Sequence, residues 1–272
     1  RLLRRRPMPV VMRSTETHRG SAAALEALAL GAVDCIGKPS SRSLPDARLR
    51  VADTVAMAAT AHVRPRAQQV PAGGHAEGRR WSGQIVLIGA STGGVEAIET
   101  VLAGFPSDCP PTLIAQHMPA AFLASFASRL ASRVRPRLKL AGDGDPIVQG
   151  QVYLAPGGET HLQLQFAGAG APRCLLLAAD KRNGHRPSVD VLFESVAEGY
   201  RERAIGIVLT GANEDGAAGL AAIKRNGGVG IVQDPGTAAK RTMPDAAIAA
   251  SVADAVLPLE DMGHFLYGLC CA

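Results

Sequence analysis

The chain has 272 residues, of which 47% are hydrophobic and 19% charged, enough apolar material for one large domain or two smaller ones. Its apolar runs have the length of strands and stay well below the roughly 18 residues of a membrane helix, so no membrane insertion is expected. The sequence shows no secretory signal pattern, and its five cysteines have neither CxxC nor CxxH spacing. We therefore expect a cytoplasmic protein with unpaired thiols and without a metal site.

The net charge of +5 is unevenly distributed along the chain. Residues 1–80 carry 14 basic and 6 acidic side chains, whereas residues 81–272 carry 15 and 18. A basic excess can indicate nucleic-acid binding, but residues 1–80 contain no Phe, Trp or Tyr that could stack on bases. The pattern favours a solvated basic face, and no nucleic-acid partner is expected.

The first part of the chain alternates short apolar runs with helical patterns. Strands are predicted there at residues 9–12 and 32–36, and helices at residues 21–30 and 44–63. Gly31 follows the first helix in the manner of a glycine cap. This order is half of a doubly wound domain, with too little sheet to be stable alone. Residues 64–83 have no periodicity and are rich in Gly, Pro, Arg and Ala, which predicts a linker.

Residues 84–272 continue the alternation over a greater length. Strands are predicted at 85–88, 112–116, 152–154, 161–166, 174–179, 204–210, 229–233 and 255–257. Helices are predicted at 95–102, 121–132, 188–199 and 217–226. Short buried strands that alternate with helices indicate an α/β fold, with a mainly parallel, doubly wound sheet covered by helices on both faces.

Reactive side chains follow three of these strands. Ser91, His117 and Asp215 each lie in the turn that follows a different predicted strand. The carboxyl ends of parallel strands meet at one edge of a sheet, where functional groups gather. Alone, the serine could be a helix cap, the histidine a buried polar group and the aspartate a turn residue. Together at one edge they favour a Ser-His-Asp triad.

The surroundings of Ser91 suit a nucleophile. Residues 89–93, GASTG, match G-x-S-x-G between a strand and a helix, where glycines allow the sharp turn that exposes the hydroxyl. The helix that follows points free N–H groups towards a developing negative charge. A serine hydroxyl is weakly nucleophilic until a base takes its proton, and histidine can do so near pH 7. A carboxylate on the far ring nitrogen would fix the histidine tautomer.

Other interpretations of this turn fit less well. A dinucleotide-binding loop would need glycine where Ser91 stands, and an acidic residue at a strand end about twenty positions later, whereas Asp108 lies in a Pro-rich stretch. A phosphate-binding P-loop would need Gly-Lys-Ser/Thr, which is absent. An α/β-hydrolase of the usual type would have the order Ser, Asp, His, whereas this chain has Ser, His, Asp.

Several stretches resemble the chemotaxis response-regulator protein-glutamate methylesterases (CheB family). The similar stretches follow the order of the family: IGASTGG at 88–94, QHMP at 116–119, YLAPG at 153–157, HRPSVDVLF at 185–193, LTG to DGAAG within 209–219, and MP at 243–244. The resemblance implies hydrolysis of glutamyl methyl esters, with deamidation of glutamine, on methyl-accepting chemotaxis receptors. It implies Ser91 as nucleophile, His117 as general base and acid, and Asp215 as the orienting carboxylate, with no cofactor.

The resemblance extends to the N-terminal part. Residues 1–63 are similar to the C-terminal half of a receiver domain, with Ser14 as the switch hydroxyl and Lys38 as the phosphate-contacting lysine. The phosphoacceptor aspartate of the family lies in earlier strands, so no residue of this chain is assigned to that role. In the family an intact receiver restrains the active site and receives its signal from a chemotaxis histidine kinase. A monomer is expected, with activity that does not respond to phosphodonors.

The chain departs from the family at one edge of the expected site. The family usually has Met-Gly-x-Asp-Gly where this sequence has Ala212-Asn213-Glu214-Asp215-Gly216. The resemblance assigns the oxyanion site to main-chain N–H groups, and we expect those of Thr92 and Ala212. Asparagine tolerates a left-handed backbone better than most residues, so we expect Asn213 to replace glycine at modest cost. The departure leaves open a weakly active paralogue that acts as a receptor- or kinase-binding module.

Overall fold

The computed structural model describes residues 8–14, 18–38, 44–62, 82–166, 171–250 and 252–270. The strands are β1 Val11–Ser14, β2 Asp34–Gly37, β3 Ile85–Ala90, β4 Thr112–Gln116, β5 Arg137–Leu140, β6 Gln151–Leu154, β7 Thr160–Gln165, β8 Arg173–Ala178, β9 Ala204–Val208, β10 Val229–Gln233 and β11 Ala255–Leu257. The α-helices are α2 His18–Ala29, α3 Leu44–Ala59, α4 Gly94–Ala103, α5 Ala120–Ala131, α6 Val189–Tyr200, α7 Ala217–Arg225, α8 Thr242–Ala249 and α9 Leu259–Cys270. Most of the predicted linker, 64–83, lies outside the described residues.

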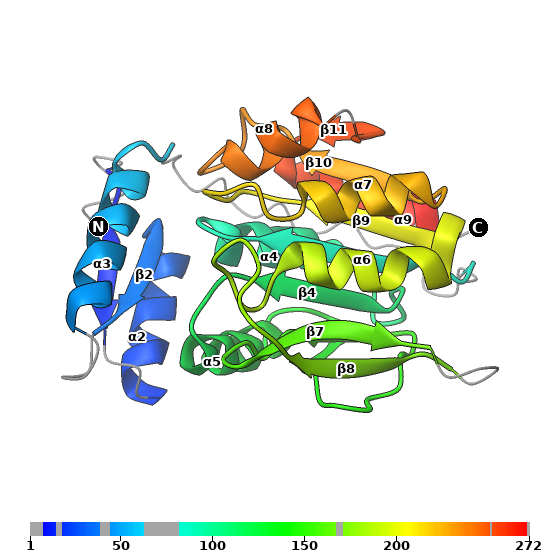
Figure 1. The fold of residues 1–272 in the computed structure, drawn as a ribbon, viewed down its shortest axis with the longest axis horizontal. Coiled ribbons are helices and arrows are strands. Elements are labelled where there is room, and N and C mark those ends of the chain that lie inside the picture. The colour runs from blue at the N-terminus through cyan, green and yellow to red at the C-terminus, as the bar shows by residue number, and fades with distance from the viewer. Residues whose placement is uncertain are drawn as a thin grey trace.

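A parallel sheet forms the centre of the larger part of the chain (Figure 1). Its seven described strands run in the order β11-β10-β9-β3-β4-β6-β5, and every neighbouring pair is parallel. The predicted α/β fold with a mainly parallel sheet is therefore confirmed. Strands β3, β4 and β9, which precede Ser91, His117 and the turn at Asp215, are adjacent in the middle of the sheet.

Helices cover both faces of this sheet, as the doubly wound pattern predicts. Successive side chains of a strand point to opposite faces, and on β3 Val86 and Ile88 belong to one core cluster whereas Ile85 and Leu87 belong to the other. Helices α4, α5 and α9 complete the first cluster, and α6, α7 and α8 complete the second. The strands before the site are therefore buried on both sides, which holds their ends rigidly.

The pattern of the sequence missed or misplaced a few elements. Strands β7 and β8 do not join the main sheet but form an antiparallel pair of their own. Strand β5 and helices α8 and α9 were not predicted from the sequence. Strand β5 lies at the edge of the sheet and alternates exposed and half-buried positions, with Arg137 and Lys139 in a run of only four residues, so its apolar signal is weak.

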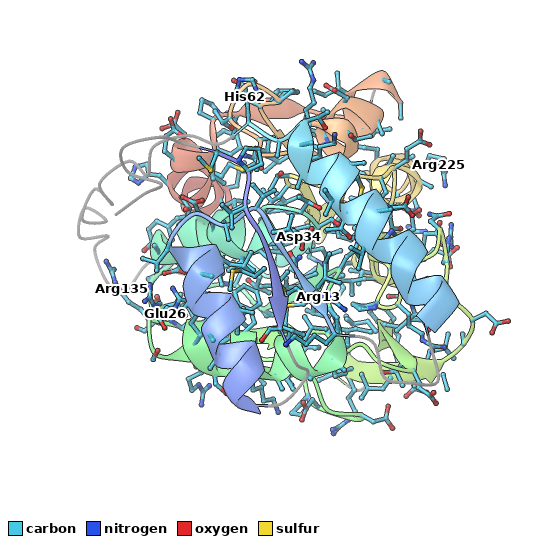
Figure 2. The ribbon with its side chains drawn as sticks, turned by 90° about the vertical axis from the view of Figure 1, so that its left-hand side faces the viewer. Arg13, Glu26, Asp34, His62, Arg135 and Arg225 are labelled. Carbon is cyan, nitrogen blue, oxygen red and sulfur yellow. The ribbon has the colours of Figure 1, made fainter. Side chains whose placement is uncertain are left out.

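The N-terminal segment, residues 8–62, packs onto the larger part of the chain (Figures 1 and 2). Strands β1 and β2 form a parallel pair, accompanied by α2 and α3. Leu25 and Leu28 of α2 are buried in the same apolar cluster as α4 and α5. Figure 2 looks onto this segment, which lies in front of the rest of the chain, with Asp34 near the middle of the view. This two-stranded segment shares a core with the larger part of the chain.

Replacing Phe193 with Ala tests the core that supports the site. Phe193 is a fully buried side chain of α6 and lies against Gly206 and Gly219. Removing this ring leaves a cavity beneath β9 and α7, and we expect the free energy of unfolding to fall by about 3–5 kcal/mol. Urea unfolding followed by circular dichroism measures this change. The matched control is Phe265→Ala on α9, where the side chain is 38% exposed and a much smaller loss is expected.

Candidate active site

Ser91 lies in a tight turn between β3 and α4. Gly93 has a φ of 81°, and a Cβ there would approach Ala239 to 2.6 Å. A Cβ on Gly94 would lie 2.0 Å from the side-chain oxygen of Gln116. Only glycine fits both positions, and the helix can therefore begin directly behind the serine. Ser91 is 8% exposed and lines a pocket.

His117 lies beside Ser91 because β3 and β4 are paired in register. Ala90 is the partner of Gln116, and the His117 N–H donates to the Ala90 carbonyl at 3.1 Å. Ser91 and His117 are thus the next residues on neighbouring strands. The buried Gln116 amide donates to the carbonyl oxygens of Ser91 at 2.9 Å and His117 at 3.2 Å, which ties the two strand ends together.

Asp215 is fully buried and points at His117. Its Oδ2 lies 2.8 Å from His117 Nε2 and accepts the Val189 N–H at 2.7 Å. Its Oδ1 accepts the Ser188 hydroxyl at 2.8 Å and the Asp190 N–H at 3.1 Å. The carboxylate therefore sits at the N-terminus of α6, where free N–H groups and the helix dipole favour negative charge.

These contacts keep Asp215 ionised. Burial alone would raise the pKa of its carboxyl, but the hydrogen bond and charge of His117 and the N–H groups of Val189 and Asp190 outweigh burial. The pKa of Asp215 is therefore held well below its ordinary value. A permanently charged carboxylate at Nε2 can stabilise an imidazolium at His117 when the ring takes up a proton.

Asp190 supports the turn that carries Asp215. Its Oδ1 accepts the N–H groups of Gly216 at 2.9 Å and Gly219 at 2.7 Å, and its Oδ2 accepts the Asn183 amide at 2.9 Å. Burial raises the pKa of this second carboxyl, and the nearby Asp215 acts in the same direction. Asp190 thus links the start of α6 to the start of α7 and holds the turn that positions Asp215.

The structure brings the three predicted catalytic residues to one edge of the sheet. His117 and Asp215 are joined directly, and Ser91 is the neighbour of His117 in the strand register. Among the described residues, no hydrogen bond links the Ser91 hydroxyl to His117. The assignment of these residues as a triad stays a prediction, and the arrangement is compatible with it because catalytic hydrogen bonds often form only in the substrate complex.

Two residues of this cluster were not assigned a role from the sequence. The His185 ring is stacked on His117, with 3.8 Å between ring centroids and an angle of 4°. The Asn213 amide nitrogen lies 3.1 Å from His117 Nδ1 and 3.0 Å from His185 Nε2. His185 begins the HRPSVDVLF stretch that resembles the family, and its position just before α6 was the available signal.

The expected backbone conformation at Asn213 was wrong. Positive φ values of described non-glycine residues occur at Asn183 and Arg201, not at Asn213. Asn213 instead uses its side chain, whose Oδ1 accepts the Asp215 N–H at 2.9 Å in an Asx turn. The side chain therefore replaces the family glycine by making a turn rather than by tolerating a left-handed backbone.

The predicted oxyanion groups lie on both sides of Ser91. Thr92 follows it on the turn, and Ala212 lies on the β9–α7 loop, whose Gly211 carries no Cβ because one would approach Ser91 to 2.9 Å. Within the described part of the chain, neither the Thr92 nor the Ala212 N–H donates a hydrogen bond. These groups stay the predicted oxyanion donors.

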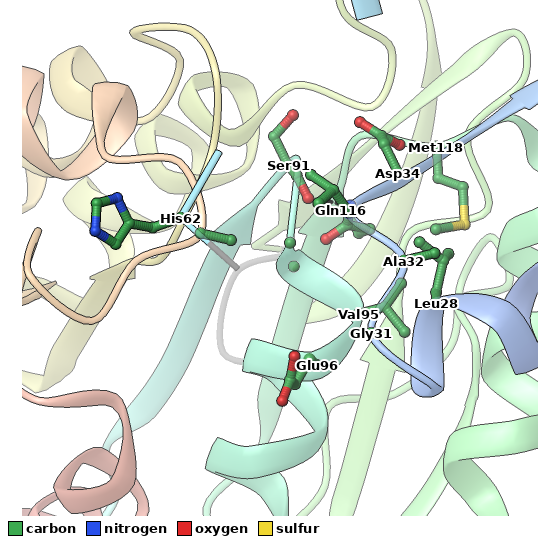
Figure 3. Close-up of a pocket in the computed structure, with 14 residues that line it drawn as sticks. Leu28, Gly31, Ala32, Asp34, His62, Ser91, Val95, Glu96, Gln116 and Met118 are labelled. Atoms are coloured by element: carbon green, nitrogen blue, oxygen red, sulfur yellow. Dashed lines mark hydrogen bonds between the residues drawn. The ribbon is translucent and has the colours of Figure 1, made fainter. Parts of the chain in front are cut away.

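The N-terminal segment contacts the Ser91 turn. Asp34 Oδ2 accepts the Thr92 hydroxyl at 2.8 Å, and burial raises the pKa of this carboxyl, against the hydrogen bonds from Thr92 and Cys35. In Figure 3 Ser91 and Gln116 lie in the middle of a pocket, with Asp34 among the N-terminal residues along one side. This pocket reaches the serine but is lined neither by His117 nor by Asp215.

The predicted receiver residues lie together at the end of the small parallel pair. Ser14 ends β1, Lys38 follows β2, and the Lys38 N–H donates to the Ser14 carbonyl at 2.7 Å. Their assignment to phosphate sensing stays a prediction. The described cysteines Cys35, Cys109, Cys174 and Cys270 form no disulfide with one another. No His, Cys, Asp and Glu cluster suited to a metal, and no helix able to span a membrane, occurs among the residues that the structure describes.

The fold and the cluster at its edge define an α/β protein with the residue types of a serine hydrolase. The chain belongs to the CheB methylesterase family, whose model matches residues 86–266. It is similar to the crystal structure of the Thermotoga maritima CheB methylesterase catalytic domain, with a TM-score of 0.67 and 38% identity over 69% of this chain and 99% of that one.

Curated relatives cover more of the chain. The protein-glutamate methylesterase/protein-glutamine glutaminase 1 of Caulobacter vibrioides is 44% identical over 275 residues, which cover 100% of this chain and 79% of the relative. A protein-glutamate methylesterase/protein-glutamine glutaminase of Agrobacterium fabrum is 45% identical over 97% of this chain and 76% of the relative. The similarity therefore includes the N-terminal segment as well as the larger part.

His185 should make the stability of the protein depend on pH. The pKa of His185 is lowered from 6.5 to about 4, mainly by burial and also by the neighbouring His117, whereas Asp215 acts in the opposite direction. Between these two values the unfolded chain binds a proton that the folded chain does not. The free energy of unfolding should therefore fall by up to about 3 kcal/mol as the pH is lowered from 7 to 4.

Urea unfolding at several pH values between 7 and 4 measures this dependence. His185→Gln removes the titrating group, so its free energy of unfolding should change less over this window than that of the unsubstituted protein. Identical pH dependence in the two proteins would contradict the prediction.

Proposed function

We propose that this chain hydrolyses γ-glutamyl methyl esters, and deamidates glutamine side chains, on methyl-accepting chemotaxis receptors. Its membership of the CheB methylesterase family and the names of its relatives support both activities. The observation that carries the proposal is the buried Asp215 carboxylate, which holds His117 beside Ser91. The family resemblance implies no cofactor.

The proposed reaction uses the three residues in sequence. The Ser91 oxygen attacks the ester carbonyl carbon, and the serine proton passes to Nδ1 of His117, whose Nε2 is held by Asp215. The tetrahedral oxyanion lies against the N–H groups of Thr92 and Ala212. Collapse of this intermediate releases methanol with the proton from His117 and leaves an acyl-serine.

Water completes the cycle. It gives one proton to His117 as its oxygen attacks the acyl carbon, and collapse returns that proton to the Ser91 oxygen and frees the glutamate side chain. With a glutamine side chain the same steps release ammonia in place of methanol. Asp215 stabilises the imidazolium in both halves of the cycle because its carboxylate stays charged.

A two-part organisation accompanies this function in the proposal. Residues 84–272 form the methylesterase unit, residues 1–63 the C-terminal part of a receiver domain, and residues 64–83 the linker. The family match to 86–266 and the separate β1–β2 pair support this division. The described cysteines form no disulfide with one another, which favours a cytoplasmic location. A chemotaxis histidine kinase as partner and a monomeric state remain predictions from the family resemblance.

The alternative of a non-catalytic receptor- or kinase-binding module is not favoured. A binding module would not need a buried carboxylate with five hydrogen-bond donors aimed at it, since an ion buried in this way is costly unless its partners are kept. The relatives are also named as enzymes.

Replacing the serine tests the enzyme function. Ser91→Ala removes the proposed nucleophile and should lower kcat for release of methanol from methyl-labelled receptor membranes by at least about a thousandfold. The matched control is Ser128→Ala, on the exposed surface of α5, whose hydroxyl donates only to the Ala124 carbonyl of its own helix. Equal methanol release from Ser91→Ala and the unsubstituted protein would show that Ser91 is not the nucleophile.

The N-terminal segment should restrain this activity because it lines the pocket at Ser91. Leu28 is 5% exposed between α2 and the rest of the chain, so Leu28→Asp buries a charge there and should loosen the segment. We expect methanol release to rise several-fold. Leu30→Asp is the matched control, since Leu30 is 65% exposed, and it should leave the rate unchanged. Equal rates for both variants would contradict this restraint.

A further inference from the structure

The side-chain amide of Asn213 hydrogen-bonds to Nδ1 of His117, the ring nitrogen that accepts the serine proton in the proposed reaction. Its Nδ2 lies 3.1 Å from His117 Nδ1 and 3.0 Å from His185 Nε2. The orientation of the amide is fixed by its other end, because Oδ1 accepts the N–H of Asp215 at 2.9 Å. The NH2 group therefore faces the two rings, and each of its hydrogens has one ring nitrogen as acceptor.

This arrangement determines where the ring protons lie. A nitrogen that accepts a hydrogen bond from an amide carries no proton of its own. Nδ1 of His117 is therefore unprotonated, and the ring proton lies on Nε2, which donates to Asp215. Nε2 of His185 is unprotonated as well, which agrees with the lowering of its pKa to about 4 by burial and by the neighbouring His117.

The lone pair on His117 Nδ1 is also the one that must accept the proton of Ser91. This lone pair cannot accept strong hydrogen bonds from the Asn213 amide and the serine hydroxyl at the same time. Among the described residues the Ser91 hydroxyl makes no hydrogen bond to this ring, as expected if the position is already taken. Asp215 fixes the tautomer of His117 without help from Asn213, so the amide adds no catalytic benefit that the carboxylate does not already supply.

We propose that Asn213 restrains the general base of this enzyme. Its amide bridges His117 and His185, an arrangement called the clamp below, and keeps the lone pair of His117 Nδ1 engaged in a hydrogen bond. The proposal rests on the function proposed above, in which His117 is the base for Ser91. The side chain acts through His117: among the described contacts it hydrogen-bonds to this ring and not to Ser91. It stands at the position where the family pattern has glycine, which has no amide to offer.

The clamp opposes the proton transfer itself. When Nδ1 takes up the serine proton, its new N–H faces the NH2 of Asn213, so the hydrogen bond is lost and two donors oppose each other. The charged groups that act on the two rings are otherwise Asp215, which contacts His117 and influences His185, and Lys181, which influences His185. Of these, Asp215 contacts His117 directly and favours the imidazolium. The amide therefore has to move away before or during each turnover.

Two substitutions remove the clamp in different ways. Asn213→Gly restores the family residue, and Asn213→Ser keeps a side-chain oxygen for the Asx-type turn at Asp215 but cannot reach the rings. Both variants should raise kcat for methanol release about three- to tenfold, the range expected when one net hydrogen bond to the ground state is lost, with KM little changed. A variant that merely disturbs the fold would lower kcat, so the direction of the change is decisive.

Two further variants separate the possible outcomes. Asn226→Ser changes an asparagine at the end of α7, whose amide donates to the Ala222 carbonyl, and should leave kcat unchanged. Ser91→Ala should abolish activity in every background. Should Ser91→Ala retain full activity, the proposed function fails. Should Ser91→Ala be inactive while Asn213→Gly and Asn213→Ser both match or fall below the unsubstituted rate, the clamp alone is overturned.

Nitrogen-15 NMR of the histidine rings provides a readout that is independent of turnover. In the unsubstituted protein the signals of the neutral His117 ring should show a proton on Nε2 and a hydrogen-bonded, unprotonated Nδ1. In Asn213→Gly the Nδ1 resonance should move towards the value of a free lone pair while the Nε2 proton stays in place. An unchanged Nδ1 resonance would show that the amide does not bind this nitrogen, and would overturn the proposal.

Discussion

The buried carboxylate of Asp215 is the constraint around which the site is arranged. A charge without exposure to water needs a donor for each of its lone pairs, and the chain supplies them from His117, directly after β4, and from Ser188, Val189 and Asp190 at the start of α6. The helix therefore has to begin directly over the carboxylate. Removing any one donor leaves part of a buried charge unsatisfied, so the position of α6 and the orientation of His117 depend on each other.

Two glycines allow α6 to approach so closely. A Cβ on Gly89 of β3 would come within 2.2 Å of the Val189 side chain, and a Cβ on Gly216 within 2.9 Å. The first glycine of the G-x-S-x-G stretch therefore serves the packing of the helix above the sheet as well as the turn before Ser91. This packing places the Val189 N–H at hydrogen-bonding distance from Asp215. Gly89 therefore affects both the turn that carries Ser91 and the position of the Asp215 carboxylate beside His117.

The sequence predicted those parts of the site that depend on local pattern. Strands β4, β10 and β11 have the predicted bounds, and the prediction that the strands before Ser91, His117 and Asp215 belong to one sheet agrees with the sheet order. Contacts between distant segments could not be predicted in this way. Nothing near Asp34 indicates that its carboxylate meets Thr92, because that contact depends on how α2 packs against α4 and α5.

Asn213 shows the same limit at a single residue. From backbone propensity we expected Asn213 to replace glycine by adopting a left-handed conformation. In the structure its side chain instead accepts a hydrogen bond in the turn and donates to the histidine rings. The restraints on the proposed reaction then act on different groups. The N-terminal segment lies over the nucleophile turn, and Asn213 occupies the base. Displacing the N-terminal segment exposes Ser91 but leaves the Asn213 amide on His117. Full activity therefore requires that both restraints are released.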